Sequence, residues 1–144
     1  MNDDAMNDAA VAIAVAVVEH DGRFLIGRRP EGVALAGRWE FPGGKVRTDE
    51  TPEDAAAREC LEETGLAVEV GAAYPQVLHR YDHGLLRLEF FAATPVDPDQ
   101  QPAEPFRWVA RKELGDYDFP PANEALVRQL VGGAGAGDQA PGRR

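Results

Sequence analysis

The sequence predicts a single α/β domain, in which short helices cover a central sheet. Residues 11–18, VAIAVAVV, form an apolar run with the composition of a strand that is buried on both faces. The segments 51–64 and 124–131 are predicted to be helices. A chain of 144 residues is expected to form one domain.

Turn signals divide the rest of the chain into strands. His20-Asp21-Gly22 is a hairpin signal, so residues 23–28 are expected to return beside the first strand. Trp39 and Phe41 are expected in a strand that follows a Gly- and Ala-containing loop at 31–37. Further strands are predicted at 67–70, 74–78, 85–93 and 106–109, the last after a Pro-rich acidic loop at 94–105.

The helix at 51–64 has agreeing signals at both ends. Thr51 is a good N-cap, Pro52 suits the first helical position, and Gly65 is a C-terminal stop. At 100° per residue, one apolar face is expected to pack on the sheet. The residues of this face are Ala56, Ala57, Cys60 and Leu61.

Three glutamates of this helix, Glu59, Glu62 and Glu63, are expected to project from its other face. Like charges at i, i+3 and i+4 destabilise an isolated helix by roughly 0.2–0.5 kcal/mol per pair. Two of the three also lie at the negative end of the helix dipole. Mg²⁺ or Mn²⁺, which prefer hard oxygen ligands, would cancel this repulsion. From these glutamates alone, a solvated acidic face remains the alternative.

The whole stretch from Gly44 to Leu66 resembles the Nudix box. That pattern is a glycine, five residues, a glutamate, seven residues and then R-E-U-x-E-E-x-G-U, where U is a bulky aliphatic. Cys60 at the first U position is the one departure, and a buried cysteine behaves as a small hydrophobe. The pattern is filled without a gap by Gly44, Glu50, Arg58, Glu59, Glu62, Glu63, Gly65 and Leu66.

Two further strings resemble the MutT-type members of that family. Residues 39–45, WEFPGGK, resemble the segment that leads into their box, and residues 118–124, DFPPANE, resemble the segment before their last helix. The resemblance covers roughly residues 11–131. It implies an α/β/α sandwich with a central mixed sheet between helices.

The resemblance also implies a set of catalytic and metal-binding residues. Arg58 and Glu50 are expected to form an ion pair that orients the metal ligands. The general base is left open between Glu59, Glu63 and Glu104. Glu104 is the candidate for a mobile loop glutamate of the family, and a simple loop charge is its alternative role. Mg²⁺, with Mn²⁺ as an alternative, would be held by the Gly43 carbonyl and by Glu59, Glu62, Glu63 and Glu104.

Four residues are expected to contact the substrate, each with a structural alternative. Arg29 would line the nucleotide pocket or belong to a surface basic pair. Phe41 would contact the base or fill the core, and Lys45 would contact phosphate or remain solvated. Asn123 would read the purine edge, because an amide donates and accepts hydrogen bonds, or would cap the last helix.

The reaction implied by the resemblance converts a nucleoside triphosphate and water into the monophosphate and pyrophosphate. The DFPPANE string, with Arg29 and Phe41, favours 8-oxo-dGTP and a role in sanitising the nucleotide pool. CTP or 5-methyl-dCTP is an alternative substrate. A Nudix module that binds ligands without catalysis is an alternative of another class.

Composition limits the partners and the setting. The net charge of −10 argues against binding to duplex nucleic acid, although a divalent cation can bridge acidic protein to phosphate. A single cysteine is expected in a reducing compartment. No apolar run approaches the roughly 20 residues of a membrane span. The N-terminus lacks the basic region of a signal peptide, so the cytoplasm is the expected location.

The folded domain is expected to span residues 10–131, as a monomer or a homodimer. Residues 1–9 are polar and expected to be mobile, and residues 132–144, GGAGAGDQAPGRR, are expected to be a flexible tail. His20 is expected to be a solvated residue of the turn. His79 and His83 are predicted to lie at the surface or at strand edges, because neither has a partner at metal-ligand spacing.

Overall fold

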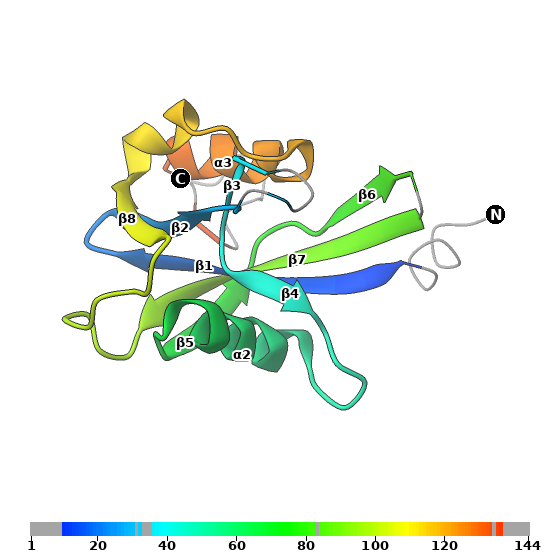
Figure 1. The fold of residues 1–144 in the computed structure, drawn as a ribbon, viewed down its shortest axis with the longest axis horizontal. Coiled ribbons are helices and arrows are strands. Elements are labelled where there is room, and N and C mark those ends of the chain that lie inside the picture. The colour runs from blue at the N-terminus through cyan, green and yellow to red at the C-terminus, as the bar shows by residue number, and fades with distance from the viewer. Residues whose placement is uncertain (1–9, 31, 33–35, 83, 134, 137–144) are drawn as a thin grey trace, which may run out of the picture.

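The computed structural model describes residues 10–30, 32, 36–82, 84–133 and 135–136. A mixed sheet lies at the centre, with α2 on one side and α3 on the other (Figure 1). The predicted α/β sandwich is therefore confirmed. The elements are β1 (Val11–His20), β2 (Arg23–Arg28), β3 (Trp39–Glu40), β4 (Gly43–Lys45), α2 (Pro52–Thr64), β5 (Val68–Ala73), β6 (Val77–Tyr81), β7 (Gly84–Pro95), β8 (Phe106–Ala110), η1 (Arg111–Asp116), η2 (Pro121–Asn123) and α3 (Glu124–Val131).

β1 is the strand that connects the parts of the sheet. It pairs in parallel with β7 and antiparallel with β4 and, at its end, with β2. β5 and β6 both pair with β7, while β3 and β8 pair with β2. Because β4 has β1 as its sheet partner, it forms a short edge beside α2.

The two faces of β1 enter different apolar clusters, as the sequence predicted for this run. Val15 and Val17 pack in the cluster that includes α3, while Ala14, Ala16 and Val18 pack in the cluster that includes α2. All five are buried. Small side chains on the α2 face let the helix approach the sheet closely.

The turn after β1 has the predicted hairpin geometry. Asp21 and Gly22 both have positive φ, at 53° and 73°, and His20 faces Arg23 across the ladder. Positive φ at both central residues matches the twist of the flanking strands. The strand predicted at 23–28 has these bounds in the structure.

Helix α2 begins and ends as predicted. The Asp54 N–H donates to Thr51 Oγ1 at 3.1 Å, and Gly65 has a left-handed φ of 79°. The prediction of its packed face was partly wrong, because Leu61 is 52% exposed and Ala57 is only half-buried. The buried residues are Ala55, Ala56, Cys60 and Thr64.

Thr64 replaces Leu61 on the packed face because its hydroxyl finds a partner within the helix. Thr64 Oγ1 donates to the Cys60 carbonyl at 2.7 Å and accepts from the Leu66 N–H at 3.1 Å. A satisfied hydroxyl can be buried at little cost. The buried residues Ala56, Cys60 and Thr64 therefore follow one another at i, i+4 spacing along α2.

Other strand boundaries differ modestly from the prediction. Phe41 lies just after β3, and the segment predicted at 74–78 begins as a strand only at Val77. Ala136 packs against the α3-side cluster, so this part of the predicted tail contacts the core. Residues 1–9, His83 and 137–144 lie outside the described residues. Within the described part of the chain, no helix is long and apolar enough to cross a membrane.

Candidate functional site

The site is built around β4, where two glycines let other groups approach the backbone. A Cβ on Gly43 would lie 2.6 Å from the Ala14 carbonyl oxygen across the ladder. A Cβ on Gly44 would overlap the carboxylate of Glu59, which extends from α2. A larger residue at Gly43 would clash with the backbone of β1, and a larger residue at Gly44 would force the Glu59 side chain to move. The Glu59 carboxylate occupies the space that a larger residue would fill.

Arg58 holds the carboxylates of this region together. It forms a bidentate pair with Glu50, with Nη2–Oε1 and Nε–Oε2 distances of 2.7 and 3.0 Å. Its Nη1 donates to Glu59 and to Glu62, at 3.2 Å in each case. Its Nη2 also donates to the Lys45 carbonyl at 3.1 Å. The predicted ion pair between Arg58 and Glu50 is present, and it ties α2 to β4.

These contacts shift the ionisation of both partners. The Arg58 guanidinium, helped by the Arg47 N–H, lowers the pKa of Glu50 to about 2. The Glu50 carboxylate in turn raises the pKa of Arg58. Both groups are therefore charged at neutral pH, and the ion pair persists over the whole neutral range.

Glu63 has the opposite electrostatic environment. Its carboxylate accepts one weak hydrogen bond, from the Gly43 N–H at 3.3 Å. Burial raises its pKa to about 7, and the charges of Glu40 and Glu59 add to this effect. Hydrogen bonding by Gly43 opposes the shift but does not cancel it. A carboxyl group that titrates near neutral pH suits proton transfer or cation binding.

The donor set fits a divalent metal such as Mg²⁺. Glu59 and Glu63 offer carboxylate oxygens beside the β4 backbone, and oxygen donors of this kind are the ligands that Mg²⁺ and Mn²⁺ prefer. Glu59 and Glu62 are turned toward Arg58 in this structure. Across the described residues, no three His, Cys, Asp or Glu side chains converge as a group that could hold a metal ion.

A cavity of about 740 Å³ lies on the other side of β4. The backbone at Gly43 and Gly44 forms part of its wall, so the cavity borders the segment that the carboxylates contact. Ile13 and Val15 from β1, with Leu86 and Leu88 from β7, give it an apolar floor. A mainly apolar cavity with a few polar groups is typical of a small-molecule site.

Three of the four predicted substrate residues line this cavity. Arg29 does so while its Nη1 forms an ion pair with Glu40 Oε1 at 2.7 Å. Phe41 is 3% exposed and stacks on Phe119, with ring centroids 5.2 Å apart. Phe41 therefore belongs to the core and to the cavity wall at once.

Asn123 is the third of these residues. It is 9% exposed and sits at the N-terminal end of α3, but its side chain makes no capping hydrogen bond. No hydrogen bond joins its carboxamide to another residue within the described chain. Asn123 therefore occupies the N-cap position of α3 without forming the capping bond. Its amide lines the cavity and can form hydrogen bonds with a ligand.

Other predicted residues lie outside the cavity wall. Lys45 is exposed, although its register opposite Ile13 places it on the cavity face of the sheet. Glu62 is half exposed, with 50% of its side chain accessible. Glu104 is exposed, in a loop held near the end of α2 by the Ala103 N–H, which donates to the Thr64 carbonyl at 2.8 Å.

The sequence analysis missed several cavity residues. Glu40 lies between Arg29 and the carboxylates, and it was not singled out. His79 was predicted to lie at the surface or at a strand edge; β6 is an edge strand, but His79 is half-buried and lines the cavity with Tyr81. Alternation along β6 places both on the same side as Val77, but the cavity on that side depends on how β6 packs with β7 and η2.

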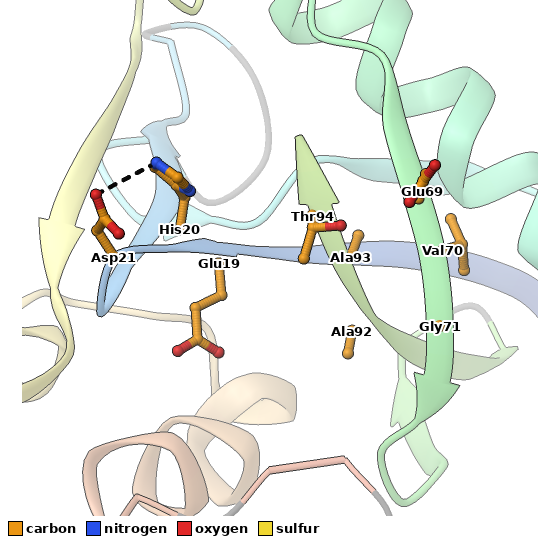
Figure 2. A pocket seen from close by; sticks show the side chains of 9 residues that line it. All are labelled: Glu19, His20, Asp21, Glu69, Val70, Gly71, Ala92, Ala93 and Thr94. Atoms are coloured by element: carbon orange, nitrogen blue, oxygen red, sulfur yellow. Dashed lines mark ion pairs between the residues drawn. The ribbon is translucent and has the colours of Figure 1, made fainter. Parts of the chain in front are cut away.

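A second cavity, of about 530 Å³, opens at the far end of the sheet, where β1 turns away from β7 toward β2 (Figure 2). Glu19, Asp21 and Glu69 give it an acidic lining. Figure 2 shows Glu19 on the opposite side of β1 from His20 and Glu69, so the acids do not converge. His20 pairs with Asp21 at 3.3 Å, and Glu19 is bound by Arg111 at 2.5 Å. Glu19 and Asp21 are therefore held in ion pairs that support the fold.

Comparisons with known proteins identify the family of the chain. Residues 13–129 match the model of the NUDIX domain family. The chain is 31% identical to the 8-oxo-dGTP diphosphatase of Escherichia coli K12 over 82% of this chain and 94% of that protein. It is 43% identical to the CTP pyrophosphohydrolase of the same organism over 84% of this chain and 91% of that protein.

Among solved structures, the MutT protein from Methanosarcina mazei Go1 is similar, with a TM-score of 0.72 and 26% identity over 85% of this chain and 93% of that one. The fold, the sequence of the box and the relatives lead to the same assignment. This chain belongs to the Nudix family and is a hydrolase of phosphoric anhydrides.

Proposed function

We propose that this enzyme hydrolyses nucleoside triphosphates in a metal-dependent reaction, with 8-oxo-dGTP as its preferred substrate. Water is added across the anhydride between the α- and β-phosphates, which gives the nucleoside monophosphate and pyrophosphate. The observation that carries the proposal is the adjacency of two features at β4. A cavity of about 740 Å³, large enough for a nucleotide base, with an uncommitted Asn123 amide lies on one side, and the Glu59 and Glu63 carboxylates lie on the other.

Glu59, Glu62, Glu63 and the Gly43 carbonyl would hold Mg²⁺, or Mn²⁺, with Glu104 as a further ligand from the loop before β8. The metal, when bound, neutralises phosphate charge and lowers the pKa of a coordinated water. Arg58 acts as a positioning residue, because its Nη1 holds both Glu59 and Glu62. Glu50 positions Arg58 in turn.

The proton of the attacking water requires an acceptor from the chain. Glu63 is one candidate, because its partly buried carboxylate lies beside the Gly43 N–H at the centre of the site. Glu59 is the alternative beside it, and Glu104 is the alternative from the loop. Lys45 projects from the cavity face of β4 and would contact a phosphate oxygen.

Recognition of the base is proposed to rest on Asn123, Phe41 and Arg29. The Asn123 amide offers a donor and an acceptor at once, which suits an oxidised purine edge. Phe41, stacked on Phe119, gives the base an aromatic wall. Arg29 is held at the cavity by Glu40 and would contact the nucleotide from this wall.

CTP, or a modified cytidine nucleotide such as 5-methyl-dCTP, is the second candidate substrate. It is favoured by the 43% identity to a relative named CTP pyrophosphohydrolase. The candidates differ in the size and hydrogen-bonding edge of the base rather than in the chemistry at phosphorus.

Pyrophosphate release tests the proposal. Wild type and Glu63→Gln are compared on 8-oxo-dGTP, dGTP, CTP and 5-methyl-dCTP, with Mg²⁺ and with a chelator. Release that needs the metal, favours 8-oxo-dGTP and falls at least roughly 100-fold in the variant is expected. Preference for a cytidine nucleotide would replace the substrate and keep the reaction. No release from any nucleotide would refute the proposed substrates and would revive the alternative of a module that binds without catalysis.

A further inference from the structure

His79 is a cavity residue to which the reaction above gives no role. It lies on β6, where Leu78 is 41% exposed and Val77 packs against the α3-side core. Alternation along the strand therefore places His79 on the same side as Val77. Its side chain is half-buried and lines the cavity of about 740 Å³.

The sheet register fixes where His79 lies relative to the carboxylates. β4, β1, β7 and β6 are four successive neighbours, so three strand spacings of about 4.8 Å separate β4 from β6, or roughly 14 Å. His79 faces Leu86, one step along the sheet from the row that contains Ile13 and Leu88. A nucleotide with its phosphates at β4 would thus extend its base toward β6.

η2 contacts β6 and lines this part of the cavity beside it. It carries Asn123, whose amide is also uncommitted. Apolar groups, including Leu86, Leu88 and Ala122, line the same cavity. In a mainly apolar site, a few polar groups orient the ligand and decide specificity.

The imidazole of His79 can form hydrogen bonds with a ligand. Within the described part of the chain, it forms no hydrogen bond or ion pair. A neutral imidazole carries one donor and one acceptor, and its planar ring can also lie against a heteroaromatic base. The distance between β6 and β4 separates His79 from the position proposed for the phosphates.

We propose that His79 is a specificity-determining residue that contacts the nucleobase from the β6 wall of the cavity that Asn123 also lines. This inference deepens the proposed function and rests on it for the class of ligand, a nucleotide. It assigns base recognition to two walls of the cavity, one on β6 and one on η2.

Binding of nucleoside monophosphates tests the inference without turnover or metal. Calorimetry gives the Kd of 8-oxo-dGMP, dGMP and CMP for wild type, His79→Ala and His79→Phe. The phenylalanine variant keeps an aromatic ring and fills the same region, so it separates loss of hydrogen bonds from loss of packing. Leu78→Ala is the matched control, because it alters the opposite face of the same strand.

The expected result is about tenfold weaker binding of the preferred monophosphate by both His79 variants, with loss of the preference among the three. The Leu78 control should keep the affinities and the preference of wild type. Affinities and preferences within about twofold of wild type in both His79 variants would overturn the inference, as would a wild type that binds none of the three. Lack of turnover in wild type would refute the proposed reaction and leave the binding result to decide this inference.

Discussion

Arg58 and Glu50 form a bidentate ion pair across α2 and the loop that follows β4, with donor–acceptor distances of 2.7 and 3.0 Å. Only 18% and 16% of the two side chains is accessible. The same guanidinium contacts Glu59 and Glu62, so one fixed cation sets the position of two proposed metal ligands. Glu50 therefore acts on the site through Arg58.

Replacing Glu50 by Gln should lower activity without removing any metal ligand. The amide keeps the size of the side chain but loses one acceptor and the negative charge, so Arg58 is no longer held at two points. Loss of such a supporting contact is expected to reduce kcat/KM or metal affinity roughly 10- to 100-fold. Titration of activity with Mg²⁺ measures both.

Glu53→Gln is the matched control for that experiment, since Glu53 is an exposed residue of the first turn of α2. It should retain wild-type kinetics. Equal activity of the Glu50 and Glu53 variants at every Mg²⁺ concentration would contradict a positioning role for Glu50.

The same ion pair predicts an acid-dependent loss of stability. The pKa of Glu50 is about 2 in the folded protein and about 4.3 in an unfolded chain. Since the folded pKa is the lower one, the contribution is complete above the unfolded value and is lost as pH falls from about 4.5 to about 2. Urea unfolding at several pH values should show wild type losing more stability over this interval than Glu50→Gln. Parallel curves for the two proteins would argue against the coupling.

Gly44→Ala should impair activity while the fold persists. A Cβ at this position overlaps the Glu59 carboxylate, which has to leave its place beside β4. We expect kcat/KM to fall by at least about tenfold, because moving a catalytic group by only about 1 Å is costly. Circular dichroism and kinetics on the same samples separate folding from activity.

Gly71→Ala provides the comparison for the Gly44 variant. Its Cβ would meet the Ala92 carbonyl oxygen at 3.6 Å, which is an ordinary contact, and Gly71 lies on β5, away from the carboxylates. Its activity should be that of wild type. If the Gly44 variant were as active as this control, the close approach of Glu59 to β4 would have no catalytic importance.

Asn123→Asp should change the base preference of the enzyme. An ionised aspartate accepts hydrogen bonds but cannot donate them, so recognition that needs a donor fails. Asn123 is 9% exposed, so burial of the new charge should also lower the free energy of unfolding, by roughly 1–3 kcal/mol. Steady-state comparison of 8-oxo-dGTP with dGTP should show a reduced ratio. A fall in melting temperature with an unchanged ratio would instead identify Asn123 as a structural residue.

Local signals were enough to predict much of the fold. The turn at Asp21-Gly22, the cap at Thr51 and the stop at Gly65 depend on residues within a few positions, and all three are present. The pair between Arg58 and Glu50 followed from a family pattern. What the sequence could not give was the far wall of the cavity. His79 lines it only because β6 pairs with β7 and faces η2, a relationship between segments about 40 positions apart.

The packed face of α2 was also predicted only in part, and two variants can test which residues belong to it. Thr64→Val should cost about 1–3 kcal/mol of unfolding free energy, because the buried Leu66 N–H loses its acceptor. Leu61→Ala, which a purely apolar face would make costly, should cost less than about 1 kcal/mol, since Leu61 is 52% exposed. Denaturant titration of the two variants gives both values. The reverse order of costs would restore the face predicted from hydrophobicity and contradict the burial of Thr64.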